Sequence, residues 1–444
     1  MEFWWSAPLE HLEWDARAAE VAAPAVSAAR ATRAQRLDFA LATSKNALCG
    51  LEAEWNALFA SARGASCMFL GFNWLWHWCD HYLDQSRQQL AIVTGRHEGR
   101  LVMVWPLVIE RRFGVKTARF AGAPVSQYGD ILVDAHAPDH HEWIAEAWGY
   151  ITRELAVDVV HLCKVRADSC LLPLLRRLGA NASNQQSAPF IGLAGGGAKF
   201  EAFDQRYCAK DRKNRRRKRK RLAELGAIGF QRIACPQRAV AALCEAMRWK
   251  RTWLEDEARV STALADDRFD RFFAGVLTSP DRPVGAEVFE LTLDGRPVAI
   301  KIALTAGDHR GMHFTAYDKT LDKCSPGALL VEEMIGHGLA DGVTTLDFLA
   351  PAFAYKLDWA TGAVAVCDYS LAVTGAGALF EGVYVQGLRP RLQRLLSNGP
   401  APLRRLAGSL VQAVWRRGQV ATEESVRSRI PAVLAPDSDR HDGL

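Results

Sequence analysis

The chain has 444 residues, more than a single hydrophobic core organises, so two or three domains are expected. Apolar residues make up 49% and charged residues 24%, a globular balance that argues against a fibrous or wholly disordered protein. The formal net charge of +5 depends on the run from Lys210 to Arg221, in which ten of twelve residues are basic. Because the rest of the chain is slightly acidic, net charge is weak evidence for a nucleic-acid partner.

Residues 1–36 are rich in alanine with scattered arginine, and we expect a flexible tail there. No basic start followed by an apolar stretch predicts a signal peptide, and no run of about 18 apolar residues predicts a membrane span. The ten cysteines include no C-x-x-C pair, which predicts free thiols in a reducing compartment and a cytoplasmic protein. The His and Cys spacings match no zinc motif, so no metal is expected.

From about Leu37 the pattern becomes globular. Two strands flanking Gly95–Arg100 predict a hairpin. The expected elements, in chain order, are helices Leu51–Ala62 and Asn73–Leu83, strands Gln89–Thr94 and Leu101–Ile109, short strands Ala118–Phe120 and Asp130–Val133, helix His141–Leu155, strand Val157–Leu162 and helix Leu171–Leu178.

The second half repeats this order, which predicts a duplicated α/β unit. A basic helix over Lys210–Arg221 is expected to link the halves. Then come helix Phe269–Leu277, a hairpin of strands Ala286–Leu293 and Pro297–Leu304 across Asp294-Gly295-Arg296, strand His313–Tyr317, helix Ala328–Ala340 and strand Thr344–Leu349. Beyond Gly387 the pattern predicts basic amphipathic helices and a disordered polar end.

The most informative stretch is the start of the helix that follows strand His313–Tyr317. Ser325 is the expected N-cap, and Pro326 is favoured in a first helical turn. Unpaired N–H groups and the positive end of the helix dipole form an anion site there, and Gly327 lets a ligand approach the backbone. The plain alternative is a well-capped strand–turn–helix connection.

The order of several motifs resembles the CelD/BcsL acetyltransferases, which are associated with cellulose biosynthesis. The resemblance spans roughly residues 50–385. Its motifs are Trp74 and Trp78, Trp105-Pro106-Leu107, Tyr128-Gly129-Asp130, the basic run Lys213–Gly226, Gly295–Ala299, Ser325-Pro326-Gly327, Asp347-Phe348, and Tyr355-Lys356 followed by Trp359. Of the usual GNAT phosphate loop, only Gly327-Ala328 is matched.

The resemblance implies mixed α/β sheets in two tandem GNAT-like domains. It implies acetyl-CoA, or another acyl-CoA, as donor, with the diphosphate at the Gly327 end of the helix and an amine attacking the thioester directly. The implied catalytic candidates are Asp347 as an exposed base, Tyr355 as an acid, Tyr317 and His313. The implied cofactor-binding residues are Ser325, Gly327, Ala328 and Lys356, and the implied substrate-binding residues are Tyr128, Asp130 and Trp78.

Each candidate residue also has a purely structural interpretation. Asp347 pairs with Lys356, Tyr355 is a buried core aromatic, His313 is a structural strand residue, and the tryptophans fill the core.

The expected division is a tail (1–36), an N-terminal domain (37–200), a basic linker helix (201–230), a C-terminal acyltransferase domain (231–385) and a basic end (386–444). The predicted acceptor is an amine or a carbohydrate hydroxyl, with an anionic contact through Lys210–Arg221 and no stable membrane insertion. The alternatives are a FemAB-like transferase with an aminoacyl-tRNA donor and a non-catalytic anion- or nucleic-acid-binding scaffold.

Overall fold

The computed structural model describes residues 37–61, 65–112, 114–134, 136–137, 140–193, 199–256, 264, 266–279 and 286–383. The predicted tail (1–36) and the predicted basic end (386–444) lie outside these residues.

The described strands belong to one mixed sheet. They are β1 (Asp38–Ala42), β2 (Gln88–His97), β3 (Arg100–Arg112), β4 (Val115–Phe120), β5 (Leu132–Val133), β6 (Val159–Arg166), β7 (Asn181–Gly192), β8 (Ile228–Ile233), β9 (Ala286–Leu293), β10 (Arg296–Ala306), β11 (His309–Tyr317), β12 (Thr345–Asp347) and β13 (Gly362–Ala372). Their spatial order is β1-β2-β3-β4-β6-β13-β7-β12-β11-β10-β9-β8, with β5 paired to β3.

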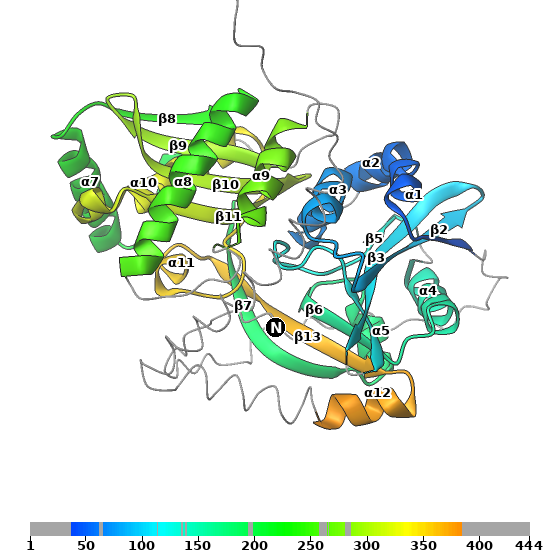
Figure 1. Ribbon diagram of the computed structural model, residues 1–444. Coiled ribbons are helices and arrows are strands. Elements are labelled where there is room, and N and C mark those ends of the chain that lie inside the picture. The colour runs from blue at the N-terminus through cyan, green and yellow to red at the C-terminus, as the bar shows by residue number, and fades with distance from the viewer. Residues whose placement is uncertain are drawn as a thin grey trace, which may run out of the picture.

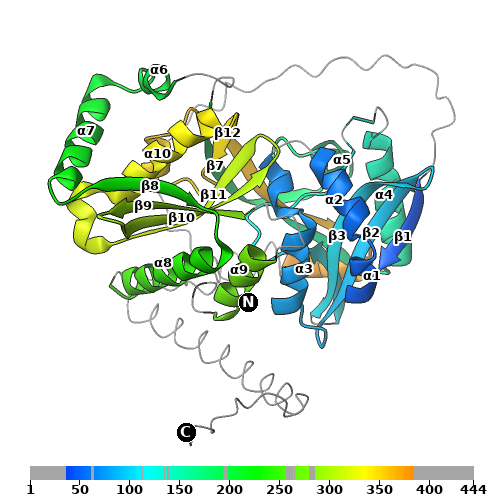
Figure 2. The same cartoon turned by 90° about the horizontal axis from the view of Figure 1, so that it is seen from above.

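Helices cover this sheet. They are α1 (Lys45–Cys49), α2 (Glu52–Ser61), α3 (Phe72–His81), α4 (His140–Glu154), α5 (Leu172–Arg177), α6 (Phe200–Asp204), α7 (Ala209–Ala223), α8 (Pro236–Asp256), α9 (Arg268–Thr278), α10 (Pro326–Ala340), α11 (Ala354–Leu357) and α12 (Gly375–Phe380), with 3-10 helices η1 (Ala65–Phe69) and η2 (Lys319–Cys324). In the second half, α8 and α9 lie on one face of the strands and α10 lies on the other with α7 (Figure 2).

Both predicted hairpins are present, and their turns explain why. Glu98-Gly99 and Asp294-Gly295 have positive φ at both turn residues, 49° and 79° in the first and 49° and 77° in the second. Such turns match the twist of the strands they join, and glycine adopts their second position without strain. The β2–β3 and β9–β10 hairpins therefore form where the sequence indicates.

The repeated order of elements is also present. In the first half, β4 pairs in parallel with β6 at Thr117–Arg119, after the chain has passed through α4. In the second half, β11 pairs in parallel with β12 at His309–Gly311, after the chain has passed through α10. Each half thus contains a hairpin, a third strand, a crossover helix and a parallel fourth strand.

Two long strands that the sequence did not indicate connect the halves. β13 pairs with β6 on one side and with β7 on the other, and the far end of β7 pairs with β12. Figure 1 shows β7 and β13 as curved strands side by side beneath both halves. The halves also meet through packed rings, since Trp74 of α3 contacts Phe272 of α9 with centroids 4.7 Å apart.

Candidate active site

The sheet opens between β11 and β12. The two strands pair only at three positions, from His309 with Thr345 to Gly311 with Asp347. Beyond that point β12 has ended, while β11 continues to Tyr317. No described strand pairs with the remainder of β11 on this side, so its edge is open.

The open edge of β11 presents backbone donors. The N–H of Asp318 donates to the Val298 carbonyl of β10 at 3.0 Å. Successive N–H groups of a strand point to opposite sides, so those of Thr315 and Tyr317 point away from β10 toward the opening.

The start of α10 lies next to this edge. Ser325 occupies the N-cap position with a left-handed φ of 49°, but its side chain makes no capping bond, so only the position of the predicted cap is correct. The N–H groups of Ala328 and Leu329 bond back to the Ser325 carbonyl. The N–H of Gly327 has no hydrogen-bond partner within the described ranges.

Tyr317 joins the strand edge to the helix start. A Cβ placed on Gly327 lies 3.3 Å from Cδ1 of Tyr317, so the ring borders the glycine closely. The Tyr317 hydroxyl donates to Asp322 Oδ1 in η2 at 3.1 Å. The structure therefore brings together four predicted residues, Tyr317, Ser325, Gly327 and Ala328.

The basic helix α7 packs beside η2 and α10. One side of it is engaged, because Arg219 pairs with Glu333 at 2.7 Å and Arg221 donates to the Lys323 carbonyl at 3.4 Å. Exposed basic residues remain on α7: Lys210, Lys213, Arg216, Arg217, Lys220 and Arg221. Positive charge is thus concentrated beside the N-terminal end of α10, the positive end of its dipole.

Asp347 lies in the interior and not on the surface as expected. Its side chain is 0% exposed and accepts hydrogen bonds from the Tyr128 hydroxyl at 2.8 Å, Arg166 Nη1 at 2.6 Å and the Leu349 N–H at 2.7 Å. Burial raises the pKa of Asp347, while the charge of Arg166 opposes that rise. The partner is Arg166, and the alternative pair with Lys356 does not form.

This network joins the two halves. Tyr128 and Arg166 come from the first half, Asp347 from the second, and the Arg166 guanidinium stacks over the Tyr128 ring 4.7 Å from its centroid. Arg166 also forms two 2.8 Å bonds to Asp168. Because every polar group of this cluster has a partner, it serves as an internal tie between the halves.

His313 is enclosed by aromatic rings. Its Nε2 lies 2.8 Å from the Val125 carbonyl, which can only accept, so Nε2 carries the proton. Nδ1 has no partner within the described residues, and the rings of Phe69, Trp74 and Phe273 lie within 6 Å of the imidazole. Burial lowers the pKa of His313 to about 4. The imidazole is therefore neutral near pH 7.

Tyr355 and Lys356 lie on α11. Tyr355 is 51% exposed and stacks on Phe353. The Lys356 ammonium is buried and donates to the carbonyls of Leu349 and Pro351, each at 2.8 Å, and burial lowers its pKa to about 8. In this structure Lys356 thus holds the loop that follows β12.

The predicted substrate-binding residues of the first half lie in the core. Trp78 donates to the Ala123 carbonyl at 2.6 Å, and Asp130 accepts from Ser169 at 2.8 Å. Both are 2% exposed, as is Tyr128. None of the three reaches a surface from which it could contact a substrate.

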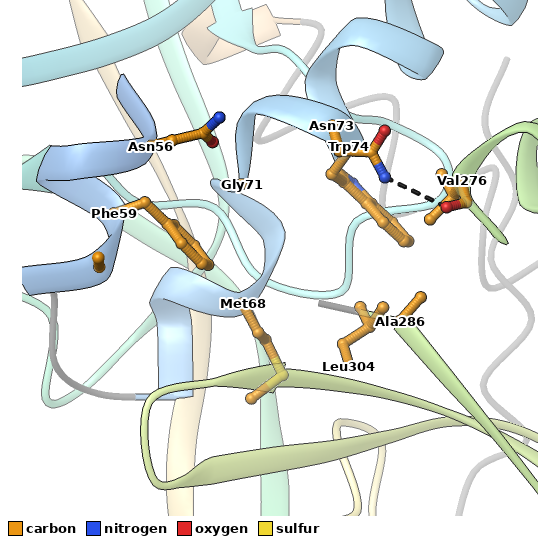
Figure 3. Close-up of a pocket in the computed structure, with 10 residues that line it drawn as sticks. Asn56, Phe59, Met68, Gly71, Asn73, Trp74, Val276, Ala286 and Leu304 are labelled. Atoms are coloured by element: carbon orange, nitrogen blue, oxygen red, sulfur yellow. Dashed lines mark hydrogen bonds between the residues drawn. The ribbon is translucent and has the colours of Figure 1, made fainter. Parts of the chain in front are cut away.

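A cavity of about 170 Å³ instead adjoins Trp74. Figure 3 shows Phe59, Met68, Trp74 and Leu304 around it, and the Asn73 amide donating to the Val276 carbonyl at 3.2 Å. Its walls come from both halves and are mainly apolar, with Asn56 and Asn73 as the polar lining residues.

Sequence reasoning missed two charged residues. Arg166 follows an apolar strand, which gives no sign that its partner lies 181 residues further along the chain. Lys301 did leave a signal, a single lysine inside the apolar strand from Pro297 to Leu304. It is opposite Thr315 of β11, is 1% exposed, and has no hydrogen bond or ion pair with any described residue.

Comparison with known protein families finds a match in the second half of the chain. Residues 209–357 match the family model described as an acetyltransferase (GNAT) domain. A search of curated proteins finds no match. None of the described helices is long and apolar enough to cross a bilayer. The domain match makes this chain an acyltransferase, as the sequence predicted.

Solved structures resemble the chain over both halves. FemX aligns at 11% identity and a TM-score of 0.53, covering 75% of this chain and 98% of FemX. A conserved protein of unknown function from Bacteroides thetaiotaomicron aligns at 12% identity and a TM-score of 0.51, covering 75% of this chain and 100% of that protein. A tandem GNAT protein from the clavulanic acid biosynthesis pathway aligns at 12% identity and a TM-score of 0.38, covering 76% of this chain and 99% of that protein. The mixed α/β, tandem GNAT-type fold is confirmed by the family match in the second half and by the repeated strand pairing of the two halves.

Proposed function

We propose that this chain transfers an acyl group, most simply acetyl, from acyl-CoA to an amine or a hydroxyl of an acceptor used in cellulose or exopolysaccharide biosynthesis. The observation that carries the donor assignment is the unbonded N–H of Gly327 at the start of α10, beside the open edge of β11. A diphosphate suits the helix start, and an extended pantetheine arm suits the edge of β11 that no described strand covers.

The chemistry follows from this placement. With the donor along β11, a β11 N–H such as that of Thr315 stabilises the oxyanion formed when the acceptor nitrogen or oxygen attacks the thioester carbon. The carbon–sulfur bond then breaks, the acceptor's N–H or O–H proton passes to water, and the CoA thiolate takes a proton. Tyr317 and Tyr355 are the candidate acids because both retain exposed surface.

The enclosed candidates take other roles. The Asp347 carboxylate is fully bonded inside the protein, and the neutral His313 lies among rings at the junction of the halves. We therefore propose that Asp347, Tyr128 and Lys356 hold the loop after β12 in place, and that Ser325 and Ala328 complete the backbone cradle around Gly327. The apolar cavity beside Trp74 is the proposed acceptor side of the site.

Acetyl-CoA is expected to stabilise the protein against thermal unfolding, and Gly327→Glu is expected to abolish this effect. A ligand present at 100 times its Kd stabilises by about 2.7 kcal/mol. The new carboxylate repels the diphosphate and fills the approach to the backbone. Thermal-shift titrations with acetyl-CoA and CoA measure the effect.

Gly336→Glu is the matched control, because it adds the same charge to the middle of α10, where a Cβ meets nothing within 4 Å. The control should respond to acetyl-CoA like the parent chain. An unchanged response in Gly327→Glu, or none in the parent, removes the proposed donor site.

The second candidate is an aminoacyl-tRNA donor. It is favoured by the exposed basic residues of α7, which extend positive charge well beyond the helix start that a single diphosphate occupies. The FemX likeness supports the shared fold alone.

If a tRNA is the donor, Lys213→Glu/Arg216→Glu/Lys220→Glu is expected to weaken tRNA binding and to reduce the slope of log Kd against log salt by about 2, since each lost phosphate contact contributes about 0.7. Filter binding across a salt series measures both. Arg176→Glu/Arg177→Glu, which reverses two exposed charges on α5 away from α7, is the control. Absence of tRNA binding, together with an acetyl-CoA response, decides for acyl-CoA.

A further inference from the structure

Three side chains with metal-ligating atoms meet on the sheet, away from the proposed donor site. They are His161 and Cys163 of β6 and Asp368 of β13, and one ligand atom from each lies within 4.8 Å of the others. His161 and Asp368 are buried, and Cys163 is half-buried. Ligand atoms around a tetrahedral zinc ion lie about 3.5 Å apart, given bond lengths of roughly 2.0–2.3 Å. The three ligand atoms would need to move closer together by roughly 1 Å to reach that spacing.

The local fold explains the cluster. Residues two apart on a strand share a face, so His161 and Cys163 point the same way while Val160 and Leu162 pack in the apolar core. β13 runs antiparallel beside them, with Ser370 opposite His161. An irregularity in β13 between Cys367 and Tyr369 lies at Asp368 and places its carboxylate in the same group.

The surroundings support ligation. The Asp368 carboxylate accepts from the Lys164 N–H at 2.8 Å and from Asn184 Nδ2 at 3.1 Å, bonds that orient it as outer contacts orient a metal ligand. Arg119 Nη2 lies 3.9 Å from Cys163 Sγ, while its Nη1 pairs with Glu110 at 3.1 Å, so a cation lies beside the sulfur.

An unsatisfied polar group lies in the same row. The Ser370 hydroxyl is 2% exposed and has no hydrogen-bond partner within the described part of the chain. A buried hydroxyl without a partner costs about 1–3 kcal/mol, and a metal-bound water would satisfy it.

We propose that His161, Cys163 and Asp368 bind a divalent transition-metal ion, with zinc the best match. One imidazole nitrogen, one thiolate and one carboxylate are ligands that zinc accepts, and the two negative charges neutralise the ion. Three protein ligands leave a fourth position for water or an external ligand. Because β6, β13 and β7 carry the junction of the halves, the ion fixes the sheet at that junction.

Cobalt substitution tests the site in the full chain. After chelator treatment, Co²⁺ titration should give a sulfur-to-cobalt charge-transfer band in the near ultraviolet and the strong visible bands of tetrahedral Co²⁺. Zinc should displace cobalt and bleach both. Cys163→Ser should abolish the charge-transfer band and weaken Co²⁺ binding at least 10-fold. Cys49→Ser, at an exposed thiol of α1, should leave both unchanged.

A second measurement guards against misfolding of the variant. Zinc should raise the melting temperature of the parent chain and of Cys49→Ser, but not that of a Cys163→Ser protein whose circular dichroism matches the parent. A titration without a charge-transfer band, or one that Cys163→Ser leaves intact, overturns the proposal. Since acetyl-CoA binding is measured separately, either proposal can fail alone.

Discussion

Replacing Arg166 by methionine is expected to lower the free energy of unfolding by about 3–5 kcal/mol, the usual cost of removing one partner from a buried ion pair. Asp347, at 0% exposure, would keep its bonds from Tyr128 and Leu349 but lose its ion pair with Arg166. Chemical denaturation followed by fluorescence measures the loss. A loss below 1 kcal/mol would contradict the internal tie described here.

The pH dependence of Arg166→Met gives an independent check. Without the guanidinium, burial raises the pKa of Asp347 further above its unfolded value. A carboxyl with a raised folded pKa contributes its stability below the unfolded pKa and loses it as pH rises through the folded pKa. The variant should therefore be more impaired at pH 8 than at pH 5.

Two control variants separate charge from packing. Arg166→Met/Asp347→Asn removes both charges and should recover a large part of the loss, because no unpaired buried charge remains. Arg177→Met, at an exposed arginine of α5, should change stability by no more than about 0.5 kcal/mol.

Replacing Lys301 by methionine is expected to stabilise the protein near neutral pH. The lysine is 1% exposed without a described partner, and burial, with Lys356 and Lys250 nearby, lowers its pKa to about 7. An unfolded lysine titrates near 10.4, so the full cost of burying the charge is about 5 kcal/mol, at 1.36 kcal/mol per pKa unit.

The sign of the pH effect is fixed by proton binding. Between about pH 7 and pH 10 the unfolded chain holds a proton at this lysine and the folded chain does not, so the stability contributed at Lys301 rises with pH. The stability advantage of Lys301→Met should therefore shrink by about 1.4 kcal/mol per pH unit across this range.

Denaturant unfolding at several pH values measures that slope. Lys323→Met, at an exposed lysine of η2, serves as the control and should show no such trend. A difference between Lys301→Met and the parent chain that does not vary with pH would show that the ammonium is not buried as described.

The parts of the fold that the sequence predicts are those set by local chemistry. Glu98-Gly99 and Asp294-Gly295 specify hairpins because few residues adopt positive φ, and Pro326 marks the start of α10 because it suits a first helical turn. Such signals need only neighbouring residues, so one sequence suffices to read them.

The parts that escaped prediction depend on contacts distant in sequence. Asp347 has the expected strand-end position, but its burial follows from Tyr128 and Arg166, which lie far earlier in the chain. The tryptophan pattern of α3 likewise predicts a buried face but does not say that α9 covers it. Exposure of the candidate catalytic groups was therefore beyond the sequence.

The position of β13 has a consequence for biosynthesis. This strand comes from near the end of the described chain, yet it lies between β6 and β7, which are made much earlier. On the ribosome, both earlier strands must wait with unpaired edges until residue 372 has emerged from the exit tunnel. A nascent chain that stalls before that point exposes the unpaired edges of β6 and β7. Rapid completion of synthesis therefore limits aggregation of newly made chains through these edges.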